Sequence, residues 1–393
     1  MRNTITGIVI GIVVGVMVGT TVVAPGLESA RHSPGSRPEN DPRVTGAEAL
    51  NLAPGTISPR LPTTARTALT TPAKRLRVIS LYPAKTPILG AIALRLQTIL
   101  PVASGGRLNV TVYDPGTLVN TPDTLDAVKS GTVDAVFAPP GQWAQNQPAL
   151  ELFSAVPFGP GANEYLAWFY QGGGRDLFDE IWKKSGLHGT LCGALAPLSS
   201  GWYRDPVRRV DDFNGLTIRA QGLGAMVLNK LGVTVKNLNV DEILFQFEQG
   251  QLDGVEYALP SIDAPLGFQK FARNYYFPGW RQPVTLFSLT INAQTWTNMS
   301  PAERTAIDTV CGDNVRYALA LSDAQQFNAL KELTLQGVQV RRWPGDILQV
   351  LRDTWKSVAR ELVTKDPGFA KVWDSQQKFH QDYAIWREIN QLE

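Results

Sequence analysis

Histidine and cysteine are scarce in this chain, and the sequence patterns of common catalytic sites are missing. Its 393 residues include three histidines, which stand far apart at His32, His188 and His380. No nucleophile-elbow motif, Walker phosphate-binding loop or metalloprotease helix motif occurs. Cys192 and Cys311 are too few and too far apart for a disulfide framework or a zinc site, which leaves either one bridge or two buried free thiols. These absences argue against an enzyme and favour a protein that binds a ligand and releases it.

Charged residues are also few, and they balance in sign. They make up 18% of the chain, and 37 basic residues nearly cancel 35 acidic ones. No basic stripe stands out, which excludes nucleic acid as a partner because phosphate binding needs a concentrated positive surface. Aromatic residues are plentiful by contrast, since ten Trp, ten Tyr and fifteen Phe can pack a core and line a ligand cleft. The length suggests two or three domains' worth of core.

The N-terminus carries an uncharged apolar run over residues 5–24, with Arg2 as the one basic residue before it. The run is long enough to cross a bilayer. Glycine recurs at every fourth position from Gly7 to Gly19, which favours close packing of membrane helices. Residues 1–24 are therefore predicted to be an uncleaved anchor in the inner membrane, with a removed signal sequence as the alternative. In both cases the positive-inside rule places the rest of the chain outside the cytoplasm.

A tether precedes the folded part of the chain. Residues 25–75 are rich in Pro, Ser, Thr and Gly and predict an extended, disordered segment. Strand-like and helix-like segments then alternate over residues 76–81, 87–100, 108–113, 123–129 and 133–138. This order predicts an α/β fold with a largely parallel sheet and helices on both faces. Ligands bind at the carboxyl ends of the strands in such sheets, where Tyr82 and Trp143 follow two of the predicted strands.

A second set of alternating segments predicts another α/β lobe. This lobe covers roughly residues 196–284 within a folded region of 76–393, and the flanking segments form the first lobe. Helices dominate from residue 301 to the end, and residues 374–389 are strongly amphipathic. The sequence thus predicts two α/β lobes with long C-terminal helices.

Arg219 and Glu256 are the strongest binding-site candidates from the residues alone. Each ends a short, apolar, strand-like run. A guanidinium offers a planar fork of donors that fits a carboxylate, and it stays charged at any working pH. With aromatic residues nearby, this arrangement suits the capture of a small organic anion. The alternative is a structural arginine paired with Asp211 or Asp212.

The folded region resembles a known family, the extracytoplasmic solute receptors of TRAP (tripartite ATP-independent periplasmic) transporters. The likeness runs from about residue 76 to 386, and its YQGGG and YYFPGW segments are most similar to the branch that binds α-keto acids and other small monocarboxylates. Many short motifs occur in the family's order: DAVKSGTVD at 126–134, AVPFG at 155–159, AWFYQGGG at 167–174, GWYR at 201–204, FNGLTIR at 213–219, LGV at 231–233, GQLDGVE at 250–256, LGF at 266–268, YYFPGW at 275–280 and VWDS at 372–375.

The resemblance implies a periplasmic receptor whose two lobes, joined by a hinge, close on an organic acid in the cleft between them and deliver it to a membrane permease. It also implies that Arg219 forms an ion pair with the ligand carboxylate, with Glu256 and Gln282 as further polar contacts. Some members of this branch dimerise by exchanging a long C-terminal helix, and the amphipathic tail permits such a homodimer. The candidate aromatic walls are Tyr82, Trp143, Trp202, Tyr257 and Trp280.

One departure from the family concerns a cation. The α-keto-acid branch often holds a cation with an acid–Trp pair, a glutamine before the Gly-Trp motif and an acid after the Pro-Gly-Trp motif. These positions hold Glu256-Tyr257, Leu198 and Gln282 here. Leucine cannot ligate a hard cation, and an amide is a weaker ligand than a carboxylate. The sequence therefore predicts no metal and no cofactor, and Glu256 would bind a ligand hydroxyl or amine or pair with Arg281.

Two other functions remain as alternatives. The long tether and the glycine-repeat anchor also fit a membrane-tethered sensory or scaffold protein that reuses the solute-binding fold. An enzyme has the least support, because no acid/base constellation is present.

Overall fold

The computed structural model describes residues 73–390. The predicted anchor at 1–24 and nearly all of the predicted tether at 25–75 lie outside these residues. The first strand starts at Lys74, two residues before the predicted beginning of the fold. Among residues 73–390, no helix combines the length and apolar character that a membrane crossing demands.

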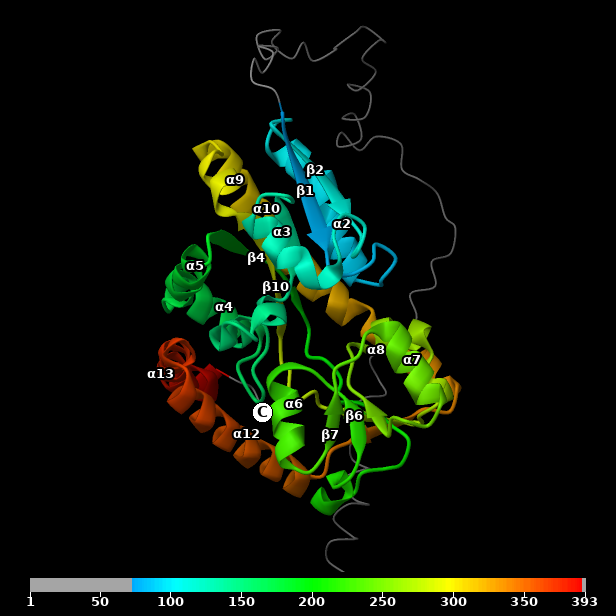
Figure 1. Ribbon diagram of the computed structural model, residues 1–393. Helices are drawn as coiled ribbons and strands as arrows, with labels where there is room; N and C mark the ends of the chain where they lie inside the picture. The colour runs from blue at the N-terminus through cyan, green and yellow to red at the C-terminus, as the bar shows by residue number, and fades with distance from the viewer. Residues whose placement is uncertain (1–72, 391–393) are drawn as a thin grey trace, which may run out of the picture. The chain divides into compact units, whose positions relative to one another are not determined.

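The first sheet has five strands in the order β2-β1-β3-β10-β4 (Figure 1). β1 pairs in parallel with β2 and β3, as the alternation of strands and helices predicts. β10 runs antiparallel to both β3 and β4, so the expectation of a largely parallel sheet is wrong on this side. The reason is that β10 returns only after the second lobe, and local patterns carry no signal of its direction. The strands are β1 (Lys74–Ser80), β2 (Leu108–Tyr113), β3 (Ala135–Ala138), β4 (Leu187–Leu195) and β10 (Thr285–Asn292).

Helices cover both faces of this sheet, as predicted. Alternate residues of a strand point to opposite faces, so Val78 and Phe137 pack in one apolar cluster while Ile79 and Val136 pack in another. The first cluster includes residues of α2 (Leu89–Ala103) and α10 (Pro301–Ala324), and the second includes residues of α3 (Thr124–Lys129), α4 (Ala162–Gln171) and α5 (Gly174–Lys184).

The second sheet has six short strands in the order β11-β9-β5-β8-β6-β7. β6 pairs in parallel with β7 and β8, whereas β5 runs antiparallel to β8 and β9. β11 joins this sheet beside β9, although it follows the range of 196–284 predicted for the second lobe. The strands are β5 (Gly201–Tyr203), β6 (Thr217–Arg219), β7 (Thr234–Lys236), β8 (Gly254–Val255), β9 (Asn274–Phe277) and β11 (Gln339–Arg342).

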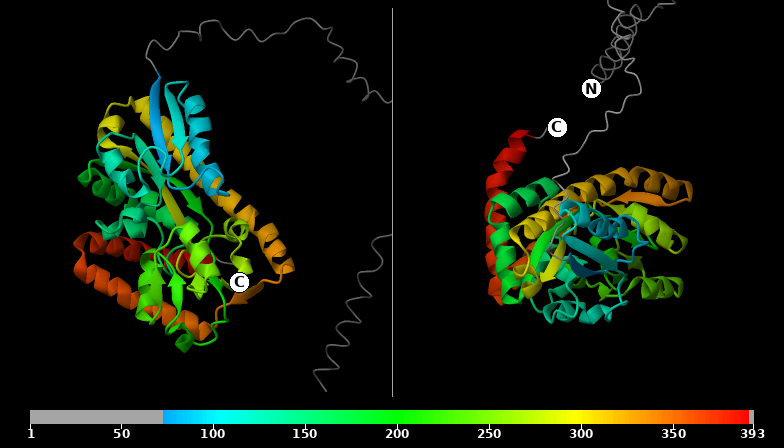
Figure 2. Two further views of the ribbon diagram at one scale, coloured as in Figure 1. Left: turned by 45° about the vertical axis from the view of Figure 1, so that its right-hand side comes forward. Right: turned by 90° about the horizontal axis from the view of Figure 1, so that it is seen from above.

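The C-terminal helices contact both lobes. α12 (Gly345–Lys365) packs on α6 (Gly222–Lys230), which follows β6 of the second sheet. α13 (Pro367–Asn390) packs on α4 and α5 of the first lobe, and the views from two directions show it running beside them (Figure 2). Trp168 in α4 donates its indole N–H to Ser375 Oγ in α13 at 3.2 Å. The predicted long C-terminal helices are therefore present, and they tie the two lobes together.

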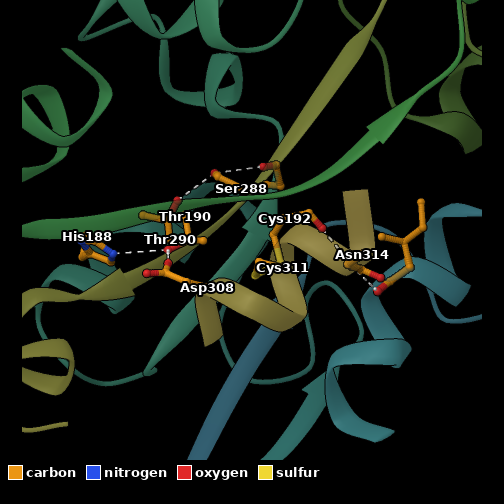
Figure 3. The surroundings of a disulfide bond; sticks show 10 residues. His188, Thr190, Cys192, Ser288, Thr290, Asp308, Cys311 and Asn314 are labelled. Atoms are coloured by element: carbon orange, nitrogen blue, oxygen red, sulfur yellow. Dashed lines mark hydrogen bonds between the residues drawn. A yellow bond between two sulfur atoms is a disulfide. The ribbon is translucent and has the colours of Figure 1, made fainter. Parts of the chain in front are cut away.

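Cys192 and Cys311 form a disulfide, which resolves the choice that the sequence leaves open. The bridge joins β4 to α10, and both cysteines are fully buried. Figure 3 shows Asn314, one turn further along α10, whose amide donates to the Cys192 carbonyl at 2.9 Å. A buried bridge between a strand of the first sheet and its covering helix fits a protein of an oxidising compartment.

We predict that a Cys192→Ser/Cys311→Ser variant loses about 2–4 kcal/mol of unfolding free energy, because the bridge closes a long loop and restricts the unfolded chain. The two cysteines are 119 residues apart. Urea unfolding under oxidising conditions measures the loss, and wild-type protein with a reductant is the control, since it should unfold like the variant. Equal midpoints for the oxidised wild type and the variant would contradict the prediction.

Candidate ligand-binding site

Arg219 is the last residue of β6 and is 6% exposed. Its Nη1 donates to the Glu256 carbonyl at 2.7 Å, and its Nε donates to the Leu238 carbonyl at 3.3 Å. Two backbone acceptors from different segments fix the plane of the guanidinium. Within residues 73–390 its Nη2 forms no hydrogen bond, so one arm of the fork remains for a ligand. Burial, reinforced by the positive charge of Arg281, lowers the pKa of Arg219 to about 10.

Two tyrosines lie near this guanidinium. The Arg219 Cζ lies 5.2 Å from the centre of the Tyr257 ring, within the range of a cation–π contact. Tyr82 follows β1 of the first lobe, and its phenol is close enough to Tyr257 and Arg219 for both to act on its pKa. Burial raises the pKa of both phenols, so both stay protonated and can donate a hydrogen bond. The structure thus brings Tyr82, Arg219 and Tyr257 together, and their role as ligand contacts stays a prediction.

Glu256 and Arg281 form a buried ion pair beside Arg219. Arg281 Nε lies 2.8 Å from Glu256 Oε2, and the two side chains are 3% and 0% exposed. The N–H does not point at the oxygen, so both Glu256 oxygens and Arg281 Nε and Nη2 lack hydrogen-bond partners among the described residues. Burial raises the pKa of Glu256, while Arg281 and then Arg219 oppose the rise. Of the sequence alternatives for Glu256, the structure supports the pair with Arg281.

Two close approaches of the backbone bring Arg281 to this position. Gly279 lies against Leu198, and a Cβ at Gly279 would lie 1.8 Å from the Leu198 carbonyl oxygen, so the turn before Arg281 requires glycine. Gly224 in α6 lies against the Arg281 side chain, and a Cβ there would lie 2.9 Å from the Arg281 Cβ. The glycines of the Pro-Gly-Trp turn and of α6 therefore have a packing explanation.

Trp202 is a core residue of the second lobe. Its ring stacks on Tyr275 at 3.9 Å between centroids, and it is fully buried. Its indole N–H donates to Asp263 Oδ2 at 3.0 Å, and the same carboxylate accepts from the Tyr275 hydroxyl and the Ala258 amide. Burial raises the pKa of Asp263 to about 6, although these three hydrogen-bond donors favour the charged carboxylate and oppose the rise. The contacts of Trp202 are thus complete without a ligand.

The remaining candidates have contacts of their own within the protein. Trp143 makes an edge contact with Trp182 of α5 in the first lobe. Trp280 stacks on Phe158 and is 3% exposed. Gln282 Oε1 accepts a hydrogen bond from Thr285 Oγ1 at 3.0 Å. These contacts account for the three side chains within the protein, so their role as ligand contacts stays a prediction.

The residues around Glu256 do not fit a metal ion. No group of three or more His, Cys, Asp or Glu side chains with the spacing of a metal site occurs in residues 73–390. The Arg281 guanidinium already lies beside the Glu256 carboxylate. Leu198 is apolar, and the Gln282 side-chain oxygen is engaged with Thr285. A hard cation needs several oxygen ligands, and with Arg281 in place the surroundings of Glu256 do not provide them.

Glu151 is a further charged residue, which sequence reasoning missed. It lies in η5 (Pro148–Phe153) of the first lobe, and its carboxyl reaches the start of α6 in the second lobe. A Cβ at Gly222 would lie 3.0 Å from Glu151 Oε2, and one at Gly141 would lie 2.9 Å from the same atom. Burial raises the pKa of Glu151 to about 7. A lone acid in an apolar run carries no sequence signal of such a contact.

The two-lobed α/β fold and the sequence both match known extracellular solute-binding proteins. The model of the family described as "Bacterial extracellular solute-binding protein, family 7" matches residues 80–366. A monocarboxylate 2-oxoacid-binding periplasmic protein of Nostoc sp. (strain PCC 7120) is 29% identical over 289 residues, which are 74% of this chain and 79% of that protein.

Solved structures agree with this match. A TRAP transporter solute-binding protein from Bordetella bronchiseptica, with copurified calcium and picolinate, has a TM-score of 0.78 and 30% identity, covering 81% of this chain and 95% of that one. A TRAP periplasmic solute-binding protein from Pseudoalteromonas atlantica, with bound sodium and pyruvate, has a TM-score of 0.76 and 25% identity, covering 81% and 97%. The chain belongs to bacterial extracellular solute-binding protein family 7, which makes it a periplasmic solute receptor of the TRAP type.

We predict that Glu151 makes the folded protein less stable as the pH rises from 4.5 to 7. The unfolded chain releases the Glu151 proton near 4.5, whereas the folded protein keeps it until about 7, so deprotonation favours unfolding in this window. Wild type should lose about 2 kcal/mol relative to Glu151→Gln across the window. Urea unfolding at several pH values measures the difference, and parallel pH profiles for the two proteins would contradict it.

Proposed function

We propose that this receptor captures a small monocarboxylate or α-keto acid through an ion pair between its carboxylate and Arg219. The observation that carries the proposal is the buried Arg219 fork, whose Nε and Nη1 are held by backbone carbonyls and whose Nη2 has no partner among the described residues. Planar guanidinium groups bind carboxylates with charge-assisted hydrogen bonds, which are stronger where water is excluded.

The electrostatics around Arg219 support an anionic ligand. Burial and the neighbouring positive charge of Arg281 both disfavour the charged form of Arg219. A carboxylate beside the guanidinium would relieve this repulsion. Tyr82 and Tyr257 would add a hydroxyl donor and an aromatic face on either side of a small ligand.

The relatives support the chemical class of the ligand. The Nostoc relative is a 2-oxoacid-binding protein, and the Pseudoalteromonas and Bordetella structures hold pyruvate and picolinate, all of which are small carboxylates. A site with one guanidinium fork near two tyrosines suits a ligand of this size.

Ligand entry requires the lobes to separate. Tyr82 comes from the first lobe and Arg219 from the second, and Arg219 and Glu256 are buried in the described conformation. Binding would then favour the closed form, whose surface differs from that of the open form and can be recognised by the TRAP permease. Attachment to the inner membrane through residues 1–24 and a homodimer through the C-terminal helix remain proposals; N-terminal sequencing of the mature protein tests the first.

We predict that Arg219→Ala weakens binding of the organic acid by ~100-fold or more, because the ligand carboxylate loses its buried charge partner. Isothermal titration calorimetry measures the loss, using the acid identified by mass spectrometry of ligand released from purified protein, with pyruvate and picolinate as reference compounds. Arg219→Lys should retain part of the affinity, since it keeps the charge and loses the fork.

Arg209→Ala is the matched control for this experiment. Arg209 is an exposed arginine that pairs with Asp211, so its removal should leave binding unchanged. Unchanged affinity in Arg219→Ala would contradict the proposed ion pair.

A further inference from the structure

The buried pair of Glu256 and Arg281 stands out because neither side chain completes its hydrogen bonds within the protein. Both Glu256 oxygens and two Arg281 nitrogens lack partners among the described residues, although the pair is almost fully buried. Buried polar atoms without partners are rare and costly. Their position beside Arg219 and Tyr257 indicates that this surface is completed by a bound ligand.

A buried carboxylate also needs a positive charge close by, because an isolated charge in a dry interior is strongly unfavourable. In the Bordetella and Pseudoalteromonas structures a calcium or a sodium ion accompanies the organic ligand. In this chain the positive charge next to Glu256 comes from a side chain, at 2.8 Å.

We infer that Arg281 is a tethered cation: its guanidinium takes the place beside Glu256 that a free metal ion would need, so this receptor binds its organic acid without a metal. The inference rests on the proposed function and adds a role for Arg281 within the same site. The Arg281 side chain fits there because Gly224 leaves it room, and its charge acts on Arg219. Arg281 Nη2 then offers the ligand a donor where a metal would offer a coordination position.

A fixed guanidinium differs from a metal ion in two ways that an experiment can detect. It cannot be removed by a chelator, and it excludes a second positive charge from the same position by repulsion. Removing it leaves Glu256 with Arg219, whose effect on Glu256 is smaller, as its counter-charge, and an added cation can then neutralise the buried carboxylate.

The test uses calcium chloride and sodium chloride as probes, with no organic ligand, so its outcome is independent of the Arg219 experiment. Wild-type protein dialysed against a chelator should show no saturable binding of calcium or sodium by calorimetry. Neither salt should change its melting temperature more than choline chloride does at equal ionic strength. Arg281→Ala should melt at a lower temperature than wild type, and calcium should raise the melting temperature of this variant. Arg281→Met, which keeps more of the side-chain volume, should respond in the same way.

Two controls make the result specific to the pair. Arg281→Ala/Glu256→Gln should melt independently of calcium, because no buried carboxylate remains to be neutralised. Arg281→Lys should behave like wild type, since it retains a cation. The inference would be overturned if wild type bound calcium or sodium saturably and Glu256→Gln abolished that binding. It would also be overturned if calcium raised the melting temperatures of Arg281→Ala and Arg281→Met no more than that of wild type.

Discussion

The charges of Arg219, Glu256 and Arg281, buried together beside the second sheet, place the strictest demand on this structure. Each is at most 6% exposed, and a charge in such surroundings must be paired or given to a ligand. Arg219 donates hydrogen bonds to two backbone carbonyls, and Glu256 and Arg281 form an ion pair with each other. The hydrogen-bonding atoms that remain without partners among the described residues support the proposed binding of a small anion beside Arg219.

The rest of the fold connects the two lobes around these charges. The Cys192–Cys311 bridge fixes β4 to α10 in the first lobe, and α12 and α13 run from the second lobe onto the first. The chain passes between the two sheets from β4 to β5, from β9 to β10 and again between α10 and β11. In the proposed function, Tyr82 on one lobe and Arg219 on the other would close on the ligand.

Sequence reasoning predicted elements such as β1, α2 and α3, because burial on one face leaves a repeating pattern. It missed β5, β7, β9 and β11, which have three or four residues each and are too short to show a period. Arg219 was predictable from its residue type and the family resemblance. The orientation of Arg281 toward Glu256 depends on close approaches at Gly224 and Gly279, which only the folded chain reveals. The approach of the Glu151 carboxyl to Gly222 is likewise visible only in the folded chain.

The most direct measurement is a crystal structure of the purified protein with its organic acid bound, at a resolution that separates metal ions from water by coordination distance. We expect a ligand carboxylate against the Arg219 guanidinium and the Arg281 guanidinium between Glu256 and the ligand. A metal ion bound to Glu256, with Arg281 turned away, would disprove the proposed role of Arg281, and a ligand carboxylate bound elsewhere would disprove that of Arg219.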